Sequence, residues 1–212
     1  MSVAGVRVAE RSDATDERSL PVHMNGPTAP AWWGMIMLIA TEAMLFATLI
    51  ASYFFLRFQA GPVWPPDDIA KPALELPLIM SVLLWSSSIP VHLGERAIKR
   101  GKVGMLKLWL ALGFVIGAVF LGMQMGIEYP EKLAEFTPTT NSYGSLFFTI
   151  TGFHGIHVLG GLIFNLWTQM RAWQGAFDDD RHVTVQNFTL YWHFVDIVWV
   201  FVLATIYLSP NL

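Results

Sequence analysis

Long runs of apolar residues, separated by short polar segments, dominate this chain from about residue 32 onward. The hydrocarbon core of a bilayer is about 30 Å thick and an α-helix rises about 1.5 Å per residue, so a membrane span needs about 20 apolar residues. Such spans must be helical, because lipid cannot satisfy open backbone groups. The pattern therefore predicts an all-α, polytopic membrane protein, a bundle of five transmembrane helices. The approximate limits of the five runs are 32–56, 76–94, 108–127, 143–170 and 184–208.

The first 30 residues differ in kind from the rest of the chain. They are polar, carry charges of both signs and contain Pro21, Pro27 and Pro30. Because they hold no short apolar stretch followed by a small-residue cleavage site, we expect no cleaved signal peptide. The chain is thus expected to consist of a polar N-terminal tail, residues 1–30, and a five-helix membrane domain, residues 31–209.

Lysine and arginine are unevenly distributed between the two sides of the predicted bundle. One side holds Arg7, Arg11, Arg18, Arg96, Lys99, Arg100, Lys102, Lys107, Arg171 and Arg181, and the other holds Arg57, Lys71 and Lys132. Cytoplasmic segments of membrane proteins carry an excess of these residues. We therefore expect the N-terminus in the cytoplasm and, after an odd number of spans, the C-terminus outside.

Composition agrees with a membrane protein and excludes other classes. Hydrophobic residues make up 54% of the chain and charged residues 14%, against about 25% charged in soluble domains. The chain has no cysteine, which excludes a disulfide scaffold, a cysteine-ligated metal site and thiol chemistry. A net charge of −3 offers no basic surface, so we expect no nucleic-acid partner.

Glu42 is an acidic residue deep inside the first predicted span. It lies about ten residues from the start of the span, or about 15 Å into the membrane. A charged side chain near mid-membrane costs at least about 2.5–3.5 kcal/mol, so we expect Glu42 to be protonated, paired or both. A carboxyl that joins two helices and a carboxyl that handles protons both remain open.

Two further polar pairs lie in the last two spans. His154 and His157 are three residues apart and are expected to share one face of the fourth helix, and His193 and Asp196 one face of the fifth. The depths of His157, His193 and Asp196 match that of Glu42, which predicts a buried polar network between helices without deciding which pairs touch. Three or four convergent ligands would make a zinc or copper site, and His157 with His193 could ligate a haem. Hydrogen-bonded histidines are the simpler interpretation, and we expect no metal site.

Gln124 and Glu128 end the third predicted span. Their four-residue spacing places both side chains on one face of the helix at the outer surface. We expect them to be interfacial polar residues, either capping the helix end or, for Glu128, pairing with a neighbouring subunit.

Five short motifs occur in order along the chain and together carry a family resemblance. They are residues 41–46 (TEAMLF), Gln124 with Glu128-Tyr129, residues 143–145 (YGS) leading into Phe147-Phe148, residues 151–158 (TGFHGIHV) and residues 191–199 (YWHFVDIVW). This set resembles subunit III of the haem-copper respiratory oxidases, over about residues 32–208. Longer members of that family have seven spans, and this chain resembles the five-helix bacterial form, which implies the bacterial inner (plasma) membrane.

The resemblance implies an accessory subunit of a proton-pumping terminal oxidase that reduces oxygen to water in aerobic respiration. Such a subunit is part of an oxidoreductase complex but binds no redox cofactor itself, because haem and copper lie in its partners, subunits I and II. It packs against catalytic subunit I, supports proton uptake, keeps that subunit from inactivating, and holds structural lipids in a V-shaped cleft. In the seven-helix form the first two helices make one wall of the cleft, so here another subunit or lipid would have to supply it.

The same resemblance assigns the polar residues of the spans. Glu42 matches the buried membrane glutamate of the family, His154 and His157 match its paired histidines, and His193 with Asp196 matches its last-helix motif.

Several functions remain open at this point. Glu42 and the run at residues 192–196 favour cytochrome c as the electron donor of the complex, with quinol as the alternative. A subunit associated with nitric oxide reductase would share the same fold. A free-standing transporter or haem-binding membrane protein is a different class, but a transporter would need substrate contacts on several helices.

Overall fold

The computed structural model describes residues 25–61, 63–66 and 69–212. Most of the predicted polar tail, residues 1–24, lies outside the described residues. The elements are η2 (Gly26–Thr28), α1 (Pro30–Ala60), α2 (Glu75–Ile98), α3 (Val103–Met123), η3 (Gln124–Glu128), α4 (Tyr129–Glu135), α5 (Ser142–Trp173), α6 (Val183–Val202), η4 (Leu203–Leu208) and η5 (Ser209–Asn211). Within the described ranges every element is helical, which confirms the all-α prediction.

Five helical segments are long and apolar enough to cross a membrane, as the sequence predicts. They are Pro30–Ala60, Glu75–Ile98, Val103–Glu135, Ser142–Trp173 and Val183–Asn211. Several extend past the predicted runs because a charged residue ends an apolar run without ending the helix. Lys107 lies inside α3 with its Nζ atom 4.3 Å from the centre of the Trp173 ring, and Lys99 pairs with Glu95 at the end of α2, 2.6 Å apart.

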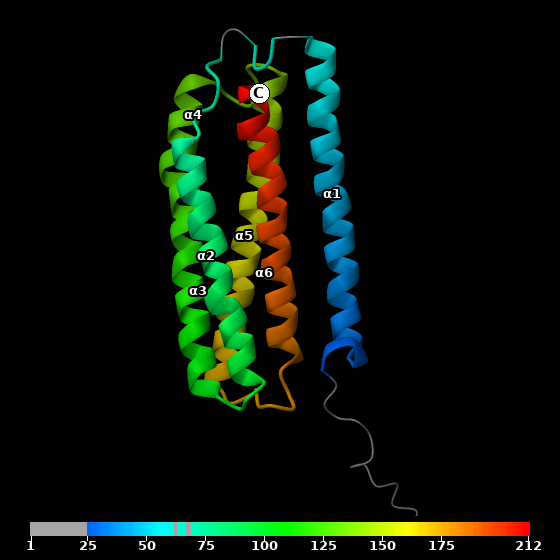
Figure 1. The fold of residues 1–212 in the computed structure, drawn as a ribbon, viewed down its shortest axis with the longest axis vertical. Coiled ribbons are helices and arrows are strands. Elements are labelled where there is room, and N and C mark those ends of the chain that lie inside the picture. Colours follow the sequence, from blue (N-terminus) through cyan, green and yellow to red (C-terminus); the bar gives the residue numbers. More distant parts are fainter. Residues whose placement is uncertain (1–24, 62, 67–68) are drawn as a thin grey trace, which may run out of the picture.

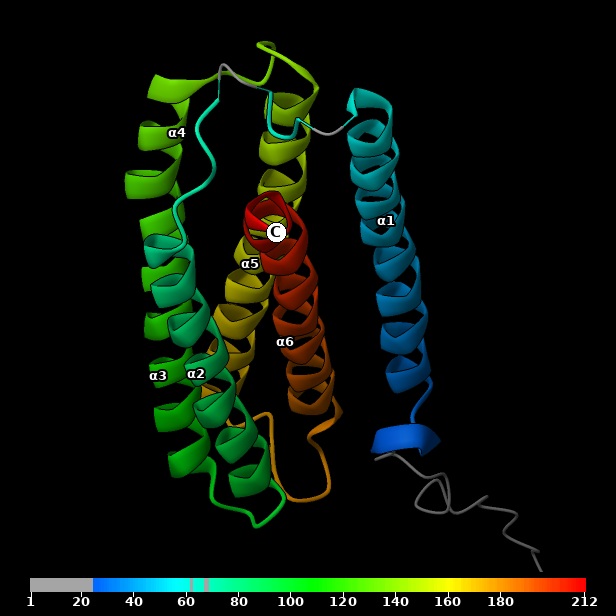
Figure 2. The same cartoon turned by 45° about the horizontal axis from the view of Figure 1, so that its top comes forward.

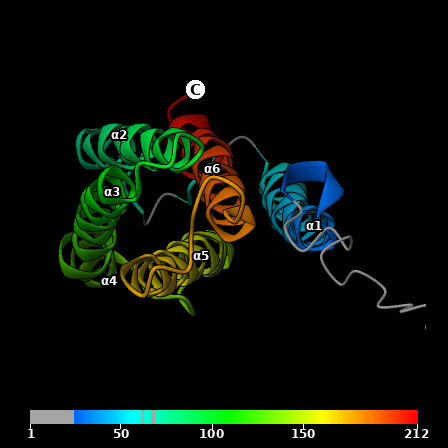
Figure 3. The ribbon, with the colours of Figure 1, turned by 90° about the horizontal axis from the view of Figure 1, so that it is seen from below.

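Four of the long helices form a closed ring, and the fifth stands beside it. In Figure 3, α2, α3, α5 and α6 surround a common centre, whereas α1 packs outside the ring against α6 and α5. We call the end at which α1 and α6 begin the lower end and the opposite end the upper end, as drawn in Figure 1. The α2–α3 and α5–α6 connections lie at the lower end, and the C-terminus lies at the upper end.

The segment that connects α1 to α2 crosses the upper end of the bundle. The two helices lie on different sides of α6, so the chain passes over the top between them (Figure 2). Trp64 anchors this segment, with its ring 5.6 Å from the ring of Tyr53 in α1 and 5.6 Å from that of Tyr143 in α5. Its indole nitrogen also donates a hydrogen bond to the Tyr53 hydroxyl, at 2.9 Å.

Trp192 of α6 occupies the centre of the ring. Its indole lies against Gly117 of α3 and Gly161 of α5, where a Cβ atom would come within 2.7 Å of an indole carbon in each case. Its ring nitrogen donates to the Ser87 hydroxyl of α2 at 2.8 Å. One side chain therefore contacts all three other helices of the ring, and the two glycines give it the space.

α1 is attached to the ring by polar contacts at both of its ends. At the lower end, the Gly26 amide donates to Gln186 Oε1 at 2.7 Å, and Asn187 Nδ2 donates to the Ala31 carbonyl at 3.0 Å. At the upper end, the Ser209 hydroxyl lies 2.7 Å from an Arg57 guanidinium nitrogen. Only Phe46 and Tyr53 of α1 are buried, so these contacts compensate for a small packed face.

Substituting Gly117 with alanine should destabilise the bundle, whereas the same change at Gly122 of the same helix should not. An added methyl at Gly117 would press on Trp192, and such overpacking costs about 1–3 kcal/mol. Nothing lies within 4 Å of the corresponding position at Gly122. Thermal unfolding of both variants in one detergent measures the difference, and equal midpoints would contradict the central role of Trp192.

Candidate functional site

Glu42 of α1 and His157 of α5 form a contact between the outer helix and the ring. The Glu42 Oε2 atom lies 3.1 Å from His157 Nε2, and the two side chains are 30% and 12% exposed. Phe46, one turn further along α1, packs on the imidazole with ring centres 5.0 Å apart. The one carboxyl of α1 is therefore paired, and the pair is partly open to the outside of the bundle.

The hydrogen bonds of this pair can be satisfied by one proton shared between the two side chains. His157 Nδ1 lies 2.7 Å from the Phe153 carbonyl oxygen, which can only accept a hydrogen bond, so Nδ1 carries a proton. The contact between Nε2 and the carboxyl then needs one more proton, which resides either on Glu42 or on the imidazole. Both arrangements are neutral overall, which reduces the cost of placing the two groups in lipid.

A second polar cluster joins α2 to α6. The Ser88 hydroxyl donates a hydrogen bond to Asp196 Oδ2 and lies 3.2 Å from His193 Nδ1. His193 Nδ1 is 4.0 Å from the same carboxylate oxygen. The His92 ring of α2 lies 6.3 Å from that of His193.

Gln124 and Glu128 form a third cluster, inside the bundle rather than at the interface where the sequence placed them. Their side chains are 0% and 2% exposed. Gln124 Nε2 donates to the Thr151 carbonyl at 3.2 Å, and the Tyr207 hydroxyl donates to Glu128. The reason is that the third span does not end here, because η3 and α4 continue it to Glu135.

His154 and His157 serve different neighbours although they are three residues apart. Three residues of α-helix turn about 300°, which leaves the two side chains about 60° apart. His157 points to α1, whereas the fully buried His154 lies between Trp199 and Phe120, with ring centres 4.9 and 6.0 Å away. The polar residues thus form separate clusters, and within the described ranges no direct hydrogen bond joins Glu42–His157 to the Asp196 cluster.

The arrangement of donors does not fit a haem between His157 and His193, because both ring nitrogens of His157 are already engaged. In the part of the chain that the structure describes, no group of three or more His, Asp or Glu side chains is placed to hold a metal ion.

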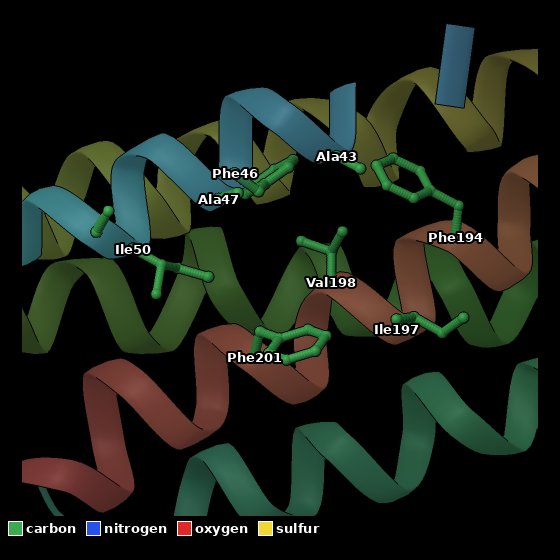
Figure 4. Close-up of a pocket in the computed structure, with 9 residues that line it drawn as sticks. Ala43, Phe46, Ala47, Ile50, Phe194, Ile197, Val198 and Phe201 are labelled. Carbon is green, nitrogen blue, oxygen red and sulfur yellow. The ribbon is translucent and has the colours of Figure 1, made fainter. Parts of the chain in front are cut away.

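An apolar pocket of about 420 Å³ lies between α1 and α6, next to the Glu42–His157 pair. Figure 4 shows α1 side chains facing those of α6 across it. Ala43, Ala47 and Ala51, spaced four residues apart on α1, face Phe194, Val198 and Phe201. Because alanine side chains are small, these three positions leave space between α1 and α6. Glu42 and the hydrogen bonds at both ends of α1 hold the helix near the ring.

At the lower end of the bundle, hydrogen bonds of Asn25 join the segment before α1 to the loop before α6. Asn25 Nδ2 donates to the Asp180 carbonyl at 2.5 Å, and the His182 amide donates to Asn25 Oδ1 at 3.2 Å. In the same loop, hydrogen bonds from Arg181 hold the pKa of Asp178 below its ordinary value. The loop thus has its own polar contacts and is hydrogen-bonded to Asn25, which precedes α1.

Sequence reasoning found the buried acids and histidines but not all of their partners. Ser88 and Tyr207 were missed, and so was the pocket. The run Ser86-Ser87-Ser88 inside an apolar span was an available signal for the first, since hydroxyls in lipid seek partners on other helices. The four-residue spacing of Ala43, Ala47 and Ala51 was a signal for the pocket.

Replacing Glu42 with alanine should destabilise the fold more than replacing it with glutamine. A glutamine amide can still donate to His157 Nε2, whereas alanine leaves that nitrogen unpaired, at a cost of about 1 kcal/mol for a hydrogen bond in a membrane. The Glu42→Ala and Glu42→Gln variants should become equally stable when His157 is also replaced by alanine. Thermal unfolding of these single and double variants measures the coupling energy between Glu42 and His157. Thr41→Ala is the control, because the Thr41 hydroxyl bonds only the Leu38 carbonyl of its own helix. A coupling energy of zero would argue against the pair.

Comparison with known proteins places the chain among the respiratory oxidases. The family model for cytochrome c oxidase subunit III matches residues 13–210. The chain is 38% identical to the probable cytochrome c oxidase subunit 3 of Nocardia farcinica, over 82% of this chain and 85% of that protein. It is 35% identical to cytochrome c oxidase subunit 3 of Synechocystis sp., over 83% and 74%, and 37% identical to the probable subunit 3 of Mycobacterium tuberculosis, over 82% and 85%. This chain belongs to the cytochrome c oxidase subunit III family.

Proposed function

We propose that the chain is the accessory third subunit of a proton-pumping oxidase that takes electrons from cytochrome c and reduces oxygen to water. In this proposal it assembles with subunits I and II, which hold the haem and copper, in the bacterial plasma membrane. Family membership is the observation that carries the proposal. Both ring nitrogens of His157 are hydrogen-bonded and not free to ligate a haem, which supports an accessory role for this chain in the redox reaction.

The lower end of the bundle faces the cytoplasm in this proposal. The basic residues of the described chain are gathered there, and the positive-inside rule places such an end on the cytoplasmic side. The lower end holds Arg96, Lys99, Arg100, Lys102, Lys107, Arg171 and Arg181, and the upper end holds Arg57, Lys71 and Lys132. The N-terminus is then cytoplasmic and the C-terminus outside.

The Glu42–His157 pair is assigned a supporting role in proton supply and in lipid order beside subunit I. The two side chains are hydrogen-bonded to each other, and the Glu42 side chain is 30% exposed at the outer surface of the bundle. The same pair sets the separation of α1 and the ring beside the apolar pocket. A pocket of this size with apolar walls suits a lipid acyl chain, so this contact would order lipid as well as hold a proton.

Assembly is tested by purifying the tagged chain in a mild detergent. We expect two larger partner subunits and the optical spectrum of a-type haem to co-purify, together with oxygen consumption driven by reduced cytochrome c. A spectrum of b- or o-type haem with quinol-driven turnover would contradict the donor, and a colourless chain alone would contradict the assembly.

The role of Glu42 is tested in the assembled oxidase by Glu42→Gln, with Thr41→Ala as the matched control. The glutamine keeps a hydrogen bond to His157 but removes the shared proton, so we expect a normal initial rate and a shorter working lifetime during turnover. Oxygen consumption followed to inactivation measures both quantities. If rate, pH dependence and lifetime all equal those of Thr41→Ala, Glu42 has only a structural role.

A further inference from the structure

We propose that His193, Ser88 and Asp196 form a proton relay at the contact between α2 and α6, which takes a proton from the aqueous phase at the lower end and stores it on Asp196. This site is separate from the Glu42–His157 pair, and it does not depend on the assembly of the oxidase.

A pocket of about 390 Å³ gives the relay its entrance. It lies between the segment before α1, the end of α2 and the start of α6, and its lining includes His92, Glu95, Lys99, Gln186 and His193. Glu95 and Lys99 neutralise each other in an ion pair of 2.6 Å. His92 and His193 are thus the remaining lining side chains with a ring nitrogen that can bind a proton.

His193 connects this pocket to the interior. Its side chain is 41% exposed, whereas that of Asp196 is only 10% exposed. His193 Nδ1 lies 3.2 Å from the Ser88 hydroxyl, which in turn bonds Asp196 Oδ2. At 4.0 Å, His193 and Asp196 are too far apart for a direct hydrogen bond, so the hydroxyl of Ser88 is the bridge.

The hydrogen-bonded chain can pass one proton with all atoms balanced. A proton from water binds His193 Nε2 and makes the imidazole a cation, whose Nδ1–H donates to the Ser88 oxygen. Nδ1 then gives its proton to that oxygen while the hydroxyl proton of Ser88 moves to Asp196 Oδ2. The imidazole ends neutral and protonated on Nε2, Ser88 regains its hydroxyl, and Asp196 becomes a neutral carboxylic acid.

The surroundings of Asp196 favour storage of that proton. Its second oxygen, Oδ1, is buried and has no hydrogen-bond partner among the described residues. Within that part of the chain, the one cationic group within 4.0 Å is His193, while His92, Glu95 and Lys99 line the pocket beyond it. An ionised carboxylate this far from water is costly, and protonation removes the charge.

Infrared difference spectroscopy on the full-length chain in detergent tests the relay. Asp196→Asn assigns the carboxyl C=O stretching band of Asp196, and a light-activated acid delivers a rapid proton pulse. We expect the band to appear after the pulse in the wild-type chain. If no band that Asp196→Asn abolishes responds to pH, the proposal is overturned.

Two substitutions at Ser88 separate conduction from folding. Ser88→Ala breaks the bridge and should slow the appearance of the band by about tenfold or more, in line with the loss of a positioned proton-transfer group. Ser88→Thr keeps the hydroxyl and should restore the rate. Ser86→Ala is the matched control, because the Ser86 hydroxyl bonds only the Leu83 carbonyl of its own helix, and it should leave the rate unchanged.

The proposal fails if Ser88→Ala is as fast as the wild-type chain, or if Ser88→Thr is as slow as Ser88→Ala. Neither outcome would touch the proposed oxidase role, which rests on co-purification and cytochrome c turnover.

Discussion

In lipid, a polar group on a helix surface must find its partner within the protein, and the arrangement of these helices follows from that constraint. The hydroxyls of α2 receive the indole nitrogens of α6: Trp199 donates to Ser81 and Trp192 to Ser87, each at 2.8 Å. The two pairs lie about two turns apart on antiparallel helices, so together they fix the axial register of α2 against α6. Once this register is set, Trp192 meets its glycines and Asp196 meets Ser88.

The position of α1 depends on the same constraint but with much less packing. The helix has hydrogen-bonded contacts at its lower end, at Glu42 and near Ser209, and between the last two it leaves an apolar pocket beside α6. Polar contacts thus hold α1 beside the ring, with the apolar pocket between α1 and α6. The apolar pocket and the paired carboxyl are two results of one arrangement.

The sequence alone predicted five helices long and apolar enough to cross a membrane, because the length of each apolar run and the helical rise determine their number. It also identified Glu42, Glu128 and Asp196, since an acidic residue in or at the end of an apolar run is visible without a structure. It could not determine which of these side chains contact one another. The side chains of His154 and His157 differ in direction by about 60° around the helix. This difference is enough to direct His154 to α6 and His157 to α1. Gln124 and Glu128 were placed at an interface because the apolar run stops there, whereas the helix continues and keeps both inside.

The crossing of the upper end by the α1–α2 connection separates α1 from its neighbour in sequence. Its principal packing partners are α5 and α6, which are the last helices to leave the ribosome. During synthesis, α1 therefore enters the bilayer first and remains without its native neighbours until almost the whole chain has been inserted. Glu42 lacks His157 until α5 has been made, so a chain stopped before α5 would leave that carboxyl in the membrane without its partner.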